Sequence, residues 1–142
     1  MPKDMYPWQA ECLTIHEGIL YNDTNLLVSA PTSGGKTLIA EILMLRAIAN
    51  DPLKRKALFV LPYVALCKEK ADKLAPLLEP LQREVKEAFG GHYSGQLLES
   101  DTGVIVCTPE NANSMYVVLQ YDLCVKVPVK NICNTEDKED KN

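Results

Sequence analysis

An eight-residue loop between two apolar segments limits what this chain can fold into. Residues 30–37 read APTSGGKT, with the apolar run LLVSA (26–30) overlapping their start and apolar residues at helical spacing (38–45) after them. Small residues let successive backbone N–H groups of a loop point inward around an anion. The N-terminus of a following helix adds unpaired N–H groups and the positive end of its dipole. The segment therefore predicts a strand, a phosphate-binding loop and a helix.

Two side chains at the end of this loop carry its chemistry. Lys36 can reach the β- and γ-phosphates of a nucleotide, and the hydroxyl of Thr37 can hold Mg²⁺. Ala30 replaces the first glycine of the usual pattern, but as the last strand residue it needs no positive φ. A glycine-rich turn of purely structural role would not need both Lys36 and Thr37. The predicted phosphate-binding residues are Ala30, Pro31, Thr32, Ser33, Gly34, Gly35, Lys36 and Thr37.

Two further apolar runs, 57–61 and 103–107, are each followed by a proline and a helical pattern. Short apolar runs that alternate with helices predict an α/β fold, a three-layer sandwich in which helices cover both faces of a parallel sheet. We expect residues 26–30, 57–61 and 103–107 to be adjacent or near-adjacent parallel strands. Their carboxyl ends should then meet at one edge of the sheet.

Composition removes several classes of protein. The 142 residues carry a net charge of −4, so any binding to nucleic acid must be local. No apolar run reaches the roughly 18 residues of a membrane span. The five cysteines form no C-x-x-C pair. Three lie in apolar segments and are interpreted as buried apolar residues, and the pattern indicates a reducing compartment, the cytosol or nucleus.

The order of the motifs resembles a known family. A glutamine in YPWQ (6–9) lies about 25 residues before the loop. LPYVALCKEK (61–70) follows the second expected strand, and CTPENANSM (107–115) follows the third. This order resembles the first motor domain of superfamily 2 DExH-type helicases, which has the RecA-like fold of P-loop NTPases. WQAECL, SAPTSGGKTLIAEILMLR, KALFVLPYVAL and ENANS look closest to the helicase domains of the DNA polymerase theta group, including its helicase-only relative. The resemblance covers residues 5–119.

The resemblance implies ligands and further site residues. It implies ATP and Mg²⁺ as cofactors, with Gln9 bonded to the adenine edge; a solvated helix glutamine is the alternative. It also implies that single-stranded or branched DNA contacts two segments through its backbone, with little sequence readout. An ordinary helix cap is the alternative for residues 108–110. The implied DNA-binding residues are Pro62, Tyr63, Ala65, Thr108, Pro109 and Glu110.

The acidic motif that this family places next is not found. After Met115, the acidic pairs at 136–137 and 139–140 lie in a polar run with no apolar strand before them. We therefore interpret residues 1–120 as the N-terminal part of a RecA-like ATP-binding domain, incomplete, and 121–142 as a divergent, disordered tail. A second motor domain is also missing. A fragment, a splice variant and a gene-model error all fit this pattern.

Three functions compete. The first is the ATP-binding part of a nuclear, ATP-dependent DNA helicase that acts in repair, truncated before the acidic motif and so inactive alone. The second is a non-catalytic module that binds ATP and nucleic acid. The third, a small phosphoryl-transfer kinase, needs several arginines in a lid, and the chain has only three.

Overall fold

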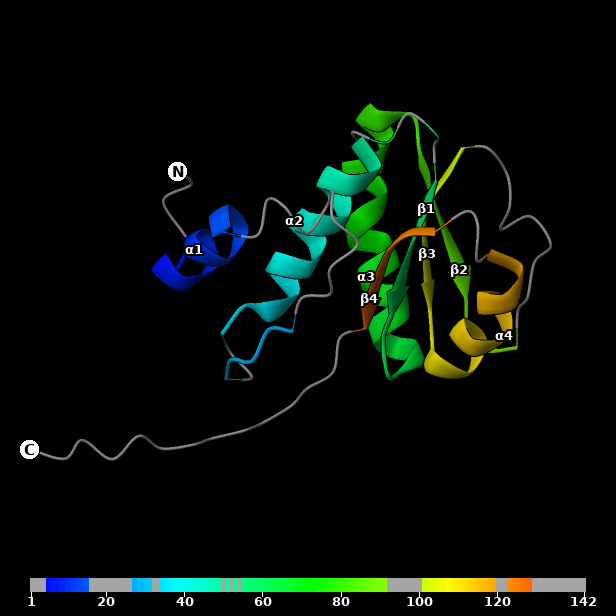
Figure 1. Ribbon diagram of the computed structural model, residues 1–142. Coiled ribbons are helices and arrows are strands. Elements are labelled where there is room, and N and C mark those ends of the chain that lie inside the picture. The colour runs from blue at the N-terminus through cyan, green and yellow to red at the C-terminus, as the bar shows by residue number, and fades with distance from the viewer. Residues whose placement is uncertain are drawn as a thin grey trace, which may run out of the picture.

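The computed structural model of the chain describes residues 5–15, 27–31, 34–49, 51, 53, 55–91, 101–119 and 123–128. Its elements in chain order are α1 (Pro7–Ile15), α2 (Lys36–Ala49), β1 (Lys56–Val60), α3 (Val64–Leu78), a 3₁₀ turn (Glu79–Leu81), β2 (Glu84–Ala88), β3 (Thr102–Cys107), α4 (Pro109–Leu119) and β4 (Leu123–Pro128) (Figure 1). No helix in these ranges is long and apolar enough to cross a membrane.

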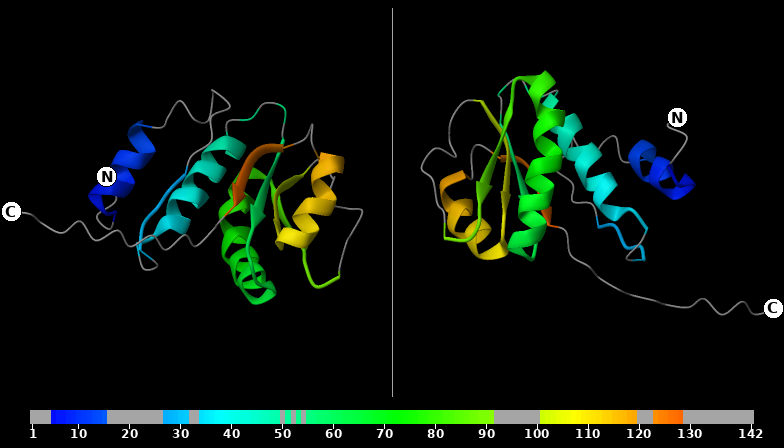
Figure 2. Two further views of the ribbon diagram at one scale, coloured as in Figure 1. Left: turned by 60° about the horizontal axis from the view of Figure 1, so that its bottom comes forward. Right: turned by 180° about the vertical axis from the view of Figure 1, so that it is seen from behind.

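The four strands form one parallel sheet in the order β2-β3-β1-β4. Helices α2 and α3 pack against one face of it, and α4 packs against the other (Figure 2). The expected three-layer α/β fold is therefore confirmed. The polar strand β2 at one edge was not expected from the sequence, because EVKEA lacks a continuous apolar run.

The central strands β1 and β3 divide their side chains between the two faces. Phe59 and Val106 belong to the core under α2 and α3, whereas Leu58 and Ile105 belong to the core under α4. Successive residues of a strand point to opposite faces, so a strand covered on both sides must be apolar at every position. This requirement explains the continuous apolar runs of the sequence.

The expected strand at residues 26–30 is not present in its described part. Residues 27–30 have no regular secondary structure, and Leu27 is 80% exposed. Val28 packs instead with the cluster between α1 and α2. Since α2 and α3 share one face of the sheet, a right-handed connection puts any strand before α2 on the outer side of β4. Among the described strands, its available partner is therefore the edge strand β4, which an apolar run in the sequence does not reveal.

Strand β4 corrects the expected division of the chain. Residues 123–128, assigned to a disordered tail, pair in parallel with β1 from Lys56–Leu123 to Val60–Pro128. The physical reason is that β1 is buried along nearly its whole length. Without β4, the backbone N–H and C=O groups on this edge of β1 would be buried without hydrogen-bond partners, which is costly. The rest of the predicted tail, residues 129–142, lies outside the described residues.

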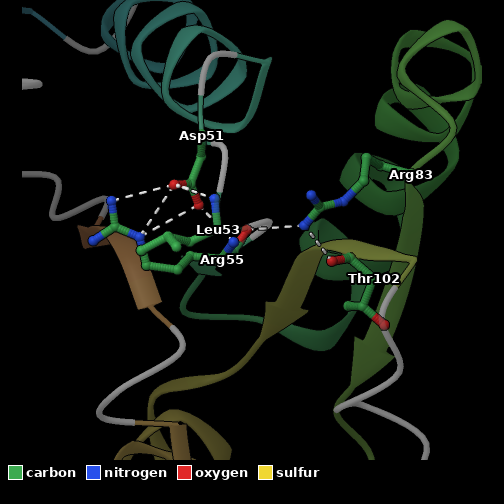
Figure 3. Close-up of polar contacts among 5 residues, drawn as sticks. All are labelled: Asp51, Leu53, Arg55, Arg83 and Thr102. Atoms are coloured by element: carbon green, nitrogen blue, oxygen red, sulfur yellow. Dashed lines mark hydrogen bonds and ion pairs between the residues drawn. The ribbon is translucent and has the colours of Figure 1, made fainter.

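Polar contacts fasten the amino ends of the strands. The guanidinium of Arg83 is buried and donates to the backbone oxygens of Arg55 (2.9 Å) and Thr102 (2.7 Å), which precede β1 and begin β3 (Figure 3). A Cβ on Gly103 would lie 2.8 Å from the Cβ of Arg83, so this approach requires glycine. Beside it, the carboxylate of Asp51 accepts bonds from the backbone N–H of Leu53 and from the backbone and guanidinium of Arg55.

Loss of the Asp51 charge should destabilise the fold in a pH-dependent way. Burial alone would raise the pKa of Asp51, but the bonds and charge of Arg55 lower it overall. Its contribution is therefore complete above the ordinary aspartate pKa of about 3.9 and disappears as the pH falls through the lower folded value. We expect Asp51→Asn to lower the free energy of unfolding by about 1–2 kcal/mol at pH 7 and by much less near pH 2.5. Urea unfolding at both pH values measures this. The exposed Asp72→Asn is the control, and an equal loss at both pH values would contradict the assignment.

Candidate functional site

The predicted motifs meet at one edge of the sheet. Helix α3 follows the carboxyl end of β1, and α4 follows that of β3, so both helices begin at this edge. Helix α2 precedes β1 and also begins there, at the lower side of Figure 1. Three helix N-termini, each with unpaired N–H groups and the positive end of a dipole, thus face the same side of the molecule.

The loop before α2 makes a tight turn that depends on its glycines. The N–H of Gly34 donates to the oxygen of Pro31 (2.9 Å), and a Cβ on Gly34 would lie 3.0 Å from that oxygen. Gly35 has a φ of 75°, a conformation that side chains disfavour. The N–H of Leu38 then bonds the oxygen of Gly35 (3.1 Å), so the loop passes directly into the first turn of α2.

The ammonium of Lys36 lies against the loop itself. Its Nζ donates to the backbone oxygens of Ala30 (2.5 Å) and Pro31 (2.8 Å). A phosphate held by this loop would offer Lys36 a charged acceptor in place of two neutral ones. Thr37 follows in the first helical turn and is partly exposed. Thr32 and Ser33, also predicted here, lie outside the described residues.

Gln9 is buried against the loop and is not a solvated helix residue. It is 2% exposed; its Oε1 accepts from the N–H of Tyr6 (2.9 Å), and its Nε2 donates to the oxygens of Gly35 (3.2 Å) and, at 3.4 Å, Gly34. Helix α1 is held there by a cluster that joins Leu13 to α2. Contact with adenine stays a prediction. The support that Gln9 gives to the loop is a role that sequence reasoning missed.

The two segments predicted to meet nucleic acid are neighbours. The N–H of Leu61, just after β1, bonds the oxygen of Cys107 at the end of β3 (2.9 Å). Pro62, Tyr63 and Ala65 are exposed, and Tyr63 is the N-cap of α3 without a side-chain capping bond. The turn at the start of α3 therefore presents backbone N–H groups and an exposed aromatic ring.

The second segment begins α4 as expected. Pro109 is the first helical residue, and the oxygen of Thr108 accepts from the N–H of Ala112 (2.9 Å). Pro109 and Glu110 are exposed, but Thr108 is only 8% exposed. Asn111 was not expected to matter; its Nδ2 donates to the oxygen of Ala88 (2.7 Å) and ties α4 to the end of β2. No pattern in the sequence distinguishes such an asparagine from a solvated one.

Metal-binding groups do not gather in the described part of the chain. Its residues contain no group of three or more His, Cys, Asp or Glu placed to hold a metal ion. Mg²⁺ usually keeps several waters and binds through few protein ligands plus substrate phosphates, which suits the hydroxyl of Thr37 beside a phosphate loop.

The buried cysteines of the core are not candidate metal ligands. Burial raises the pKa of Cys67, and raises that of Cys107 to about 12, so these core thiols stay protonated at neutral pH.

Known proteins resemble nearly the whole chain. The family model of DEAD/DEAH box helicases matches residues 6–132, which extends past residue 120, where sequence analysis expected the family pattern to end. DNA polymerase theta of Drosophila melanogaster is 40% identical over 112 residues, 79% of this chain and 5% of that protein. Helicase POLQ-like of Caenorhabditis elegans is 41% identical over 113 residues, 78% of this chain and 12% of that protein.

An archaeal relative is similarly close. The ATP-dependent DNA helicase Hel308 of Pyrococcus abyssi is 39% identical over 115 residues, 80% of this chain and 15% of that protein. The expected resemblance to the polymerase theta group is thus confirmed. The chain spans a small part, 5–15%, of the length of these three relatives.

The contact between Gly35 and Gln9 can be tested with a double-mutant cycle. A Cβ on Gly35 would collide with Nε2 of Gln9, and its φ of 75° adds a backbone cost of about 1–2 kcal/mol for alanine. We expect Gly35→Ala to weaken nucleotide binding strongly in the parent chain and less strongly in the Gln9→Ala chain, which removes the collision but not the backbone cost. Titration with a fluorescent ATP analogue measures both effects. Equal losses in the two chains would mean that Gln9 does not lie against the loop.

Proposed function

Because this chain belongs to the DEAD/DEAH box helicase family, we propose that it is the ATP-binding part of an ATP-dependent DNA helicase that acts in DNA repair in the nucleus. The observation that carries the proposal is the loop of glycines that ends at the N-terminus of α2, with the ammonium of Lys36 against its backbone oxygens. Similarity to DNA polymerase theta and to the ATP-dependent DNA helicase Hel308 supports DNA as the nucleic acid.

Each residue of the nucleotide site has a distinct task in this proposal. Lys36 moves from the oxygens of Ala30 and Pro31 to the β- and γ-phosphates, while the N–H groups of the loop and of α2 surround the triphosphate. The hydroxyl of Thr37 holds Mg²⁺, which neutralises phosphate charge when bound. The amide of Gln9 joins α1 to the loop through the oxygen of Gly35. We also assign to Gln9 a contact with the adenine edge.

DNA is proposed to lie along the starts of α3 and α4. The bond between the N–H of Leu61 and the oxygen of Cys107 holds the ends of β1 and β3 side by side, so the starts of α3 and α4 lie at the same edge of the sheet. Backbone N–H groups at helix starts bind phosphate and sugar without reading bases, which suits single-stranded or branched DNA of any sequence. The net charge of −4 agrees with contact confined to this edge.

A non-catalytic role of the 142-residue chain is favoured by one observation. Strand β4 ends at the same edge as the motifs, where a carboxylate would have to hold Mg²⁺ and orient water. Between Asp122 and Glu136, however, the sequence contains no carboxylate. We therefore propose that this chain assayed by itself binds ATP and DNA but does not turn ATP over.

Nucleotide binding should depend on Lys36. Removal of one charge-assisted contact costs on the order of 1.5–3 kcal/mol, so Lys36→Ala should weaken ATP binding by about 10- to 100-fold. Calorimetric titration of the parent and the variant measures this loss, with the exposed Lys68→Ala as control. Equal affinity of parent and Lys36→Ala would refute the phosphate-loop assignment.

Phosphate release should stay at background with and without single-stranded DNA. Transfer of a phosphoryl group rests on positioning and charge stabilisation, and an arginine finger alone is typically worth about 10³–10⁵ in rate. A coupled assay for inorganic phosphate on the purified chain tests the expectation. DNA-stimulated release that Lys36→Ala abolishes would show that the chain supplies a catalytic carboxylate after all.

A further inference from the structure

An ion pair joins the two helices that leave the proposed ATP and DNA segments. The Nζ of Lys70 on α3 lies 2.5 Å from Oε1 of Glu41 on α2, and the two residues are 29 positions apart in the sequence. Each side chain is 19% exposed. Both charged ends are therefore partly removed from water, unlike the Glu69–Lys73 pair on the surface of α3, whose side chains are about 60% exposed.

The pair lies close to the starts of both helices. Glu41 is five residues after Lys36 and one turn after Thr37, which puts it about 7.5 Å along α2 from its start. Lys70 is six residues after Val64, about 9 Å along α3, and two turns after Tyr63. Both helices begin at the carboxyl edge of the sheet and share one face of it (Figures 1 and 2). The pair thus bridges the first halves of the two helices.

The free energy of such a contact depends on the relative position of its helices. The attraction between two charges grows as the surrounding dielectric falls, and solvent screens a partly buried pair less than an exposed one. A ligand that shifts the start of α2 or α3 changes the separation of Glu41 and Lys70. If one ligand shifts its helix, the ion pair changes in free energy. That change alters how easily the second helix adopts the position needed to bind the other ligand.

We propose that Glu41 and Lys70 are positioning residues that couple nucleotide binding at the phosphate loop to DNA binding at the start of α3. The inference rests on the proposed function, because it needs both ligands to bind this chain. It assigns to the two side chains an effect on the affinity of each ligand in the presence of the other. Coupling of this kind is reciprocal, so one factor must describe both ligands.

The test is a linkage measurement on the whole chain. The affinity of the Mg²⁺ complex of a non-hydrolysable ATP analogue is measured with and without a saturating oligo-dT, and the affinity of the oligonucleotide with and without the analogue. For the parent we expect a coupling factor of about fivefold or more. Glu41→Gln and Lys70→Gln should bring the factor close to one. Each ligand alone should bind within about twofold of the parent, the deviation typical of sites that share no contact. The double variant with the charges exchanged, Glu41→Lys with Lys70→Glu, should restore coupling.

The matched control is Glu69→Gln, which breaks the exposed pair on α3 and should leave the coupling factor unchanged. Thermal unfolding of every variant separates loss of coupling from loss of fold. A parent factor of one, or single variants that retain the parent factor, would overturn the coupling role while leaving the proposed function intact. Failure of the parent to bind either ligand would overturn both proposals.

Discussion

The pairing of β1 on both of its edges is the constraint on which the rest of the structure depends. β1 bonds β3 on one side and β4 on the other, and helices cover its two faces. Burial of a large apolar side chain such as Phe59 contributes about 1.5–3 kcal/mol, and the ladders satisfy the backbone groups buried with it. The carboxyl end of β1 then fixes where the segment 61–65 emerges. The position of β1 therefore determines the position of the proposed DNA-binding segment.

The predicted phosphate loop is held differently from the segments proposed to bind DNA. In the described residues, no strand partner fixes residues 27–30. The loop is positioned instead from its other end by α2, by the bonds of Lys36 to Ala30 and Pro31, and by the amide of Gln9. Side-chain contacts of this kind exchange more easily than a backbone ladder does. A loop held in this way can rearrange around a phosphate without disturbing the sheet.

Polar groups secure the opposite edge of the sheet, away from the site. Arg83 bonds the backbone before β1 and at the start of β3, and Asp51 caps the turn that leads into β1. These hydrogen bonds tie the amino ends of β1 and β3 together, and loss of one partner would leave a buried group unpaired at a cost. The carboxyl edge, in contrast, carries the exposed residues Pro62, Tyr63, Pro109 and Glu110, where we propose that DNA binds.

The sequence by itself determined the central strands β1 and β3 with the helices beside them, the turn of the phosphate loop and the edge at which the motifs meet. These features follow from residues that are neighbours in the sequence. The small residues of APTSGGKT favour a turn around an anion, and the continuous apolar runs ALFVL and GVIVC are typical of strands covered on both faces. Only the tertiary structure decided that residues 123–128 pair with β1 and that residues 27–30 have no strand partner among the described residues. It also decided that Gln9 contacts the loop and that Lys70 contacts α2. The physical reason is that such contacts join residues 25 or more positions apart, and their energy depends on which faces and edges the fold brings together rather than on the residues beside them.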